Sequence, residues 1–161
     1  MIAVINSSPL ISLAVINQLS LLKGIFTVVH VPAHVYQEVL AYEAQKPGAY
    51  RIQLARLKVT SVADEMTAKV LSYQLDRGEA EVIALGCKIM PDFVIIDELK
   101  GRRIGKYLGL NVTGTIGLLL MAKELQLINK IRPFLDDLIE KGIWISDKLY
   151  SQALTLAREK D

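Results

Sequence analysis

The segment Phe93-Val94-Ile95-Ile96-Asp97-Glu98 places two acidic residues directly after a short run of apolar, mostly β-branched side chains. A continuous run of this kind is typical of a β-strand that is buried on both faces. The segment Ile2-Ala3-Val4-Ile5-Asn6 has the same form, with an amide in place of the carboxylates. We therefore predict two buried strands, each followed directly by a side chain with oxygen atoms that could bind a ligand.

Strand-like and helical segments alternate along the rest of the chain. Further strands are predicted at residues 27–31, 58–62 and 110–112. Amphipathic or apolar helices are predicted, among others, at residues 32–43, 79–87, 99–108 and 115–125. This alternation indicates an α/β fold class with a central, mostly parallel sheet flanked by helices. A length of 161 residues suits a single domain, residues 1–161.

Composition narrows the class of protein. Hydrophobic residues make up 52% and charged residues 22% of the chain, which favours a well-packed globular protein. The net charge of +2 is too small to indicate a nucleic-acid partner, so any such role must depend on local charge. Cys87 is the single cysteine, which excludes an internal disulfide and a thiolate zinc cluster. Without a basic secretory leader or a long apolar stretch, we expect a cytoplasmic protein with no membrane association.

Polar side chains stand where apolar segments stop, at Asn6, Glu38, Glu79 and Asp97. In a parallel sheet, residues just past the carboxyl ends of the strands line the crevice where ligands bind. Carboxylates gathered there repel one another unless a cation neutralises them, and oxygen ligands suit Mg²⁺ or Mn²⁺. Each residue also has an ordinary explanation, such as helix-dipole stabilisation for Glu79 or capping for Asp97. Taken together, the residues favour a metal-dependent phosphodiesterase.

Two nearby features could contact nucleic acid. A basic segment follows Asp97 and contains Lys100, Arg102, Arg103 and Lys106. It could form a solvated helix face or contact phosphates beside the metal site. The turn Thr113-Gly114-Thr115 could offer hydroxyl and N–H groups to an anion at a helix start, or could serve only as a cap.

The order of several motifs resembles the PIN-domain superfamily. These motifs are Asn6-Ser7-Ser8-Pro9-Leu10-Ile11, then Gly78-Glu79-Ala80-Glu81-Val82-Ile83-Ala84-Leu85, then Ile96-Asp97-Glu98 followed by Gly101-Arg102-Arg103. The Thr113-Gly114-Thr115 turn and the closing segment 145–150 fit the same pattern. More narrowly, the chain resembles a prokaryotic branch that is catalogued as a domain of unknown function and associated with toxin–antitoxin loci. The resemblance spans nearly the whole chain.

This resemblance implies an endoribonuclease that uses Mg²⁺ or Mn²⁺ to hydrolyse phosphodiester bonds. The acids of the family fall on Asn6, Glu38, Glu79 and Asp97, of which Asn6, Glu79 and Asp97 would hold metal. Glu81 and Glu98 are neighbours that could substitute or assist. Asn6 departs from the family, because aspartate is the commonest residue at that position.

The implied partners are RNA and, for a toxin, a small antitoxin protein. A second copy of the chain is also expected as a partner, because the apolar segment 116–121 carries more hydrophobic surface than one helix face needs, unless the last two helices cover it. The alternative function is a catalytically weak PIN-like module that binds RNA or a protein, since Asn6 removes one charge from the site.

Overall fold

A computed structural model describes residues 1–45, 56–62 and 65–159. Its sheet has five strands in the order β3-β2-β1-β4-β5, and every neighbouring pair is parallel. The strands are β1 (Ile2–Ile5), β2 (Val28–Pro32), β3 (Lys58–Thr60), β4 (Phe93–Ile95) and β5 (Val112–Thr113). The predicted α/β class with a central parallel sheet is thereby confirmed.

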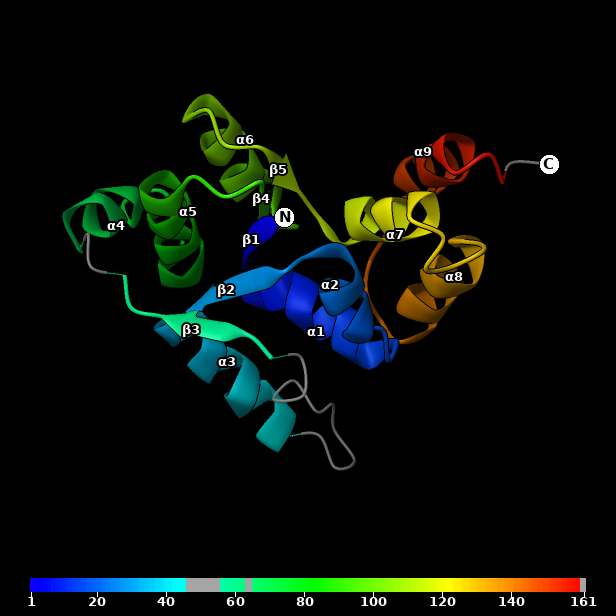
Figure 1. Ribbon diagram of the computed structural model, residues 1–161, viewed down its shortest axis with the longest axis horizontal. Helices are drawn as coiled ribbons and strands as arrows, with labels where there is room; N and C mark the ends of the chain where they lie inside the picture. Colours follow the sequence, from blue (N-terminus) through cyan, green and yellow to red (C-terminus); the bar gives the residue numbers. More distant parts are fainter. Residues whose placement is uncertain (46–55, 63–64, 160–161) are drawn as a thin grey trace.

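Helices cover both faces of this sheet (Figure 1). One side carries α1 (Ser7–Val15), α2 (Ser20–Ile25) and α3 (Ala33–Ala44). The other side carries α4 (Glu65–Leu71), α5 (Arg77–Ile89) and α6 (Leu99–Tyr107). A third group beside α1 and α2 consists of α7 (Thr115–Glu124), α8 (Arg132–Glu140) and α9 (Asp147–Leu156).

The centre of the sheet is fully apolar. The β1 residues Ala3, Val4 and Ile5 are 0% exposed, which explains why this strand reads as an uninterrupted hydrophobic run. β1 lies between β2 and β4, and Ile5 is in register with Ile95. The chain runs from β1 to β2 on one side and reaches β4 on the other, so a topological switch point lies between β1 and β4. The backbone N–H of Asn6 donates to the carbonyl of Ile95 at 3.0 Å, which fixes the two strand ends side by side.

The start of α5 was predicted two residues too late, at Glu79 rather than Arg77. Asp76 is the N-cap: its carboxylate accepts the N–H of Glu79 at 2.8 Å, and the Glu79 carboxylate accepts the N–H of Asp76 at 3.3 Å. This reciprocal capping box satisfies two otherwise unpaired N–H groups and extends the helix backwards to Arg77. Glu79 therefore sits in the first turn of α5 and not at its start.

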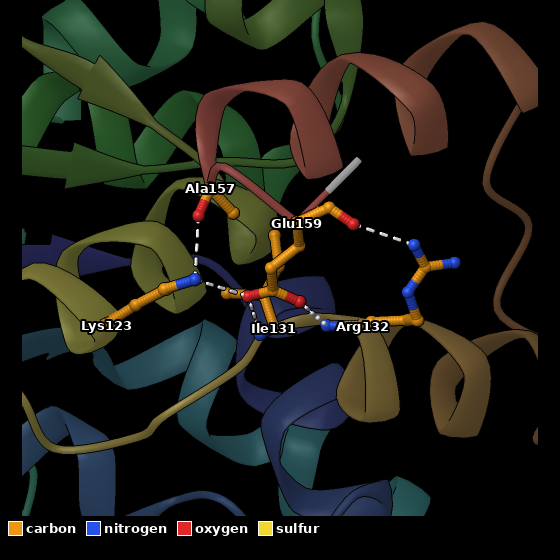
Figure 2. Close-up of polar contacts among 5 residues, drawn as sticks. All are labelled: Lys123, Ile131, Arg132, Ala157 and Glu159. Carbon is orange, nitrogen blue, oxygen red and sulfur yellow. Dashed lines mark hydrogen bonds and ion pairs between the residues drawn. The ribbon is translucent and has the colours of Figure 1, made fainter. Parts of the chain in front are cut away.

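Helices α1, α2 and α9 cover much of the apolar surface of α7. Leu118 and Leu119 are 0% exposed, and α7 contacts α1, α2 and α9. Glu159 links α7 to the start of α8, as Figure 2 shows. Its carboxylate accepts hydrogen bonds from Lys123 Nζ at 2.7 Å and from the N–H groups of Ile131 and Arg132 at 2.8 and 3.0 Å. Burial by itself raises the pKa of Glu159, but the bonds from Lys123 and the two amides outweigh this effect and lower that pKa. Among the described residues, no helix has the length and apolarity to cross a membrane.

Candidate metal centre

Glu98 joins the ends of β1 and β4 through its carboxylate. Asn6, which is 2% exposed, donates from Nδ2 to Glu98 Oε2 at 3.4 Å. The hydroxyl of Ser8 donates to the other oxygen, Oε1, of the same carboxylate. These contacts orient the Asn6 amide so that its carbonyl oxygen Oδ1 is left buried and accepts no hydrogen bond from the described residues.

Glu79 presents a second buried oxygen without a partner. The residue is 6% exposed, and its Oε2 is used in the capping box with Asp76. Its Oε1 accepts no hydrogen bond of ordinary geometry within the described part of the chain. Burial raises the pKa of Glu79, and the nearby carboxylates of Asp76 and Glu98 raise it further, while the amides of Asp76 and Gly101 partly oppose the rise.

Gly78 lies at the point where three of the polar side chains meet. A Cβ atom placed on Gly78 would stand 3.2 Å from Glu38 Oε2 and 3.4 Å from both Asn6 Oδ1 and Asp76 Oδ1. Glu38 reaches this point from α3, and its other oxygen lies 3.2 Å from Nε2 of His34. Oxygen atoms from β1, α3 and the start of α5 therefore surround one position.

Asp97 is held by the N-terminus of α7. Its Oδ1 accepts the N–H of Thr115 at 2.7 Å and its Oδ2 accepts the Thr115 hydroxyl at 2.6 Å. Burial raises the pKa of Asp97, and the negative charge of Glu98 raises it further. The two hydrogen bonds from Thr115 and the positive charge of Arg102 lower it, but the net change is a rise. Arg102 donates from Nη1 to the carbonyl of Ile96 at 3.0 Å, so its guanidinium lies at the same strand end.

We call six residues the acidic cluster: Asn6, Asp97 and Glu98 after the ends of β1 and β4, Asp76 and Glu79 at the start of α5, and Glu38 on α3. Two members supply buried oxygen atoms that lack hydrogen bonds, and such atoms suit a hard divalent cation. No group of three or more His, Cys, Asp or Glu side chains close enough to hold a metal ion occurs among the described residues. Mg²⁺ fits this donor set even so, because it keeps several water ligands and needs only one or two protein carboxylates beside substrate oxygens.

Five of the residues that the sequence suggested lie at this edge of the sheet: Asn6 contacts Glu98, Asn6 and Glu38 lie near Gly78, and Glu79 and Asp97 both lie near Glu98, with Asp97 held by Thr115. The structure does not bring Glu81 to them, because that carboxylate pairs with Nε of Arg77 at 2.9 Å and lines a separate cavity. Asp76 was missed, although the spacing from Asp76 to Glu79 is that of a capping box.

The predicted nucleic-acid residues are divided between several places. The Thr115 hydroxyl already donates a hydrogen bond to Asp97, and the Arg102 guanidinium already donates one to the carbonyl of Ile96. Arg103 lines a groove between α4 and α6 together with Tyr107. The others stand around these sites: Lys100 and Lys106 are exposed on α6, and Thr113 is half-buried in β5.

Comparisons with known proteins add one match. The sequence model of a family described as PIN domain matches residues 2–159. A search of curated proteins found no match, and a search of solved structures found none either.

Proposed function

Because the chain belongs to the PIN-domain family, whose members are generally nucleases, we propose that it is an endoribonuclease that depends on Mg²⁺ or Mn²⁺. The observation that supports this most directly is the pair of buried, unpaired oxygen atoms, Asn6 Oδ1 and Glu79 Oε1, at the switch point of the sheet. Open parallel sheets bind their ligands at such a point. Burial raises the pKa of Glu79 and of Asp97, and carboxyl groups with shifted pKa values are common at functional sites.

In this proposal Asn6, Glu79 and Asp97 hold the ion, and Glu38 and Glu98 complete the negative charge around it. A bound Mg²⁺ or Mn²⁺ would activate water and stabilise charge on the scissile phosphate. The chain itself orients the ligands: Glu98 fixes the Asn6 amide, Asp76 fixes Glu79, and Thr115 fixes Asp97. Each of these neighbours binds an oxygen or nitrogen of a ligand and limits its rotation, as supporting residues of metal sites do.

The neutral amide at Asn6 supports a second candidate function. A carbonyl oxygen still coordinates a hard cation, but it contributes no negative charge, so metal affinity is weaker than with aspartate. A catalytically weak module that binds RNA or a protein is therefore the alternative.

The proposal also includes two protein partners, a small antitoxin protein and a second copy of the chain. A toxin role would require a small antitoxin protein, and exposed apolar side chains near the C-terminal helices could serve a protein partner or a second copy of the chain. Trp144 is 85% exposed and Leu156 is 71% exposed. Sedimentation at micromolar concentration, alone and with the product of any neighbouring small reading frame, would test both.

Cleavage of single-stranded RNA in Mn²⁺ tests the proposed activity. We expect wild-type cleavage that EDTA abolishes and that Asp97→Asn reduces by at least about 100-fold, since one ligand charge is lost while the Thr115 contact survives. Glu140→Gln, which changes an exposed carboxylate on α8, is the matched control and should cleave normally. If wild type does not cleave, or if Asp97→Asn cleaves as well as the control, the module alternative replaces the nuclease.

A further inference from the structure

A cavity of about 740 Å³ opens between α3, α4 and α5, next to the acidic cluster. Its volume falls in the range of about 300–1,000 Å³ that is typical of small-ligand sites. The polar side chains that line it include His34, Gln37, Ser61, Lys69, Ser72 and Arg77. Small apolar residues, among them Ala68 and Ala80, form other parts of the wall.

The cavity and the acidic cluster share two helices. On α3, His34 lines the cavity and Glu38, one turn later, belongs to the cluster, and the two side chains lie 3.2 Å apart. On α5, Arg77 lines the cavity, and the next two residues, Gly78 and Glu79, face the cluster. The cavity and the acidic cluster are therefore neighbours along both helices.

The charge in the cavity suits a phosphate backbone. Lys69 and Arg77 supply two cations, and Glu81 supplies one carboxylate. Arg77 is paired with Glu81 through its Nε, and its side chain is 71% exposed while that of Glu81 is 12% exposed. A guanidinium carries further N–H donors, so a phosphate can bind Arg77 while the pair with Glu81 stays intact.

The basic helix α6 offers a less suitable path. Arg102 is already bonded to the Ile96 carbonyl, and Arg103 lines a groove whose other walls include the apolar side chains of Val70, Leu71 and Ile104. By contrast, hydroxyl and amide groups surround the cations of the cavity between α3, α4 and α5. These groups can bind the sugar and base of a nucleotide.

We propose that this cavity holds the single-stranded RNA segment next to the scissile phosphate, with Lys69 and Arg77 binding its phosphates. This inference rests on the proposed nuclease function and names where its substrate lies. Glu81, which the sequence suggested as a metal ligand, instead positions Arg77 in the cavity.

Binding of a fluorescent, hydrolysis-resistant single-stranded RNA of about ten nucleotides, followed by anisotropy in Mn²⁺ over a range of KCl concentrations, tests the proposal. Each lost phosphate contact lowers the salt slope by about 0.7, which corresponds to about four-fold in affinity at about 0.15 M salt. The double variant Lys69→Gln/Arg77→Gln should therefore bind about 15-fold more weakly, with a slope reduced by about 1.4.

A charge-matched control separates a local contact from overall charge. Lys88→Gln/Lys148→Gln removes two exposed cations from the far end of α5 and from α9, and it should bind like wild type. Equal weakening of both double variants, or no weakening of either while wild type binds and cleaves RNA, overturns the cavity proposal and leaves the nuclease standing. If wild type neither binds nor cleaves RNA, both proposals fail together.

Discussion

Replacement of Glu79 by glutamine removes one negative charge from inside the acidic cluster and leaves the side-chain volume almost unchanged. Glu79 is 6% exposed, and its Oε1 accepts no hydrogen bond of ordinary geometry in the described structure. Burial raises its pKa, and Asp76 and Glu98 raise it further. In the metal-free protein the ionised carboxylate therefore destabilises the folded state.

The size of the effect follows from opposing contributions. Leaving a buried acceptor unsatisfied costs about 1–3 kcal/mol and more when the group is charged, and glutamine removes the charge although it keeps a polar group there. In the opposite direction, the dipole of α5 stabilises the negative charge of Glu79 in its first turn by about 0.3–1 kcal/mol. Glutamine keeps an oxygen that can accept the N–H of Asp76, and capping boxes accommodate glutamine at this position. We expect Glu79→Gln to raise the free energy of unfolding by about 1 kcal/mol near neutral pH, and Tm by about 2–4 °C for a chain of this length.

The stability gain of Glu79→Gln should depend on pH, in a direction that follows from the raised pKa of Glu79. A carboxyl with a raised folded-state pKa favours folding when it is protonated, and this contribution is lost as pH rises through the folded pKa. The advantage of Glu79→Gln should therefore appear above that pKa and vanish as pH falls toward the ordinary value of 4.5. Thermal melts in EDTA across this range, with the exposed Glu140→Gln as control, measure it.

A destabilised Glu79→Gln at neutral pH, or a gain that persists in acid, would refute this reasoning. Either result would mean that the dipole and capping contacts of Glu79 outweigh its burial. Addition of Mn²⁺ gives an independent check, because a ligand that binds only the folded state raises Tm. Wild type should be stabilised by Mn²⁺ more than Glu79→Gln is.

Three further substitutions test other parts of the structure. Asn6→Asp places a charge where the amide now donates to Glu98 at 3.4 Å, so we expect a loss of about 1–2 kcal/mol in EDTA but tighter Mn²⁺ binding by calorimetry. Gly114→Ala puts a Cβ 2.6 Å from Asp97 Oδ1. Melts should therefore show a loss of about 1–3 kcal/mol, and RNA cleavage should fall as well. Glu159→Gln removes a charge that is held by three donors, and a loss of about 1–3 kcal/mol is expected near neutral pH. Because the Glu159 pKa is lowered, melts should show that loss shrinking as pH falls through this pKa.

The sequence was sufficient to predict the central strands and the residues at their ends. β1 and β4 are buried on both faces, so their apolar runs are uninterrupted, and the polar residue that stops each run marks the carboxyl edge of the sheet. Asn6 and Asp97 could be placed for this reason. The family resemblance pointed in the same direction, and the match over residues 2–159 confirms it.

Other parts of the candidate site depend on helix phase, which the sequence pattern left open. Glu79 and Glu81 are two residues apart on α5, and helical geometry turns such residues to different faces. The two-residue separation of Glu79 and Glu81 is the same whether α5 begins at Arg77 or at Glu79. Because the helix includes Arg77, however, Glu81 lies one turn after Arg77 and pairs with it, while Glu79 faces Gly101. The position of Glu98 between Asn6 and Ser8 likewise depends on a contact across 90 residues or more, and no local pattern reports such a contact.

Three glycines show how the backbone builds the acidic cluster. A Cβ on Gly78 would lie 3.2 Å from Glu38 Oε2, one on Gly101 would lie 2.5 Å from Glu79 Oε1, and one on Gly114 would lie 2.6 Å from Asp97 Oδ1. Gly78 and Gly101 lie in the first turns of α5 and α6, and Gly114 caps α7. The N-terminal ends of these helices carry partial positive charge, so close approach offsets part of the repulsion among the carboxylates. A side chain at Gly101 or Gly114 would force the carboxylate and the helix end apart, whereas one at Gly78 would require shifts of only a few tenths of an ångström. The cluster would then lose part of this stabilisation without the loss of any acidic residue.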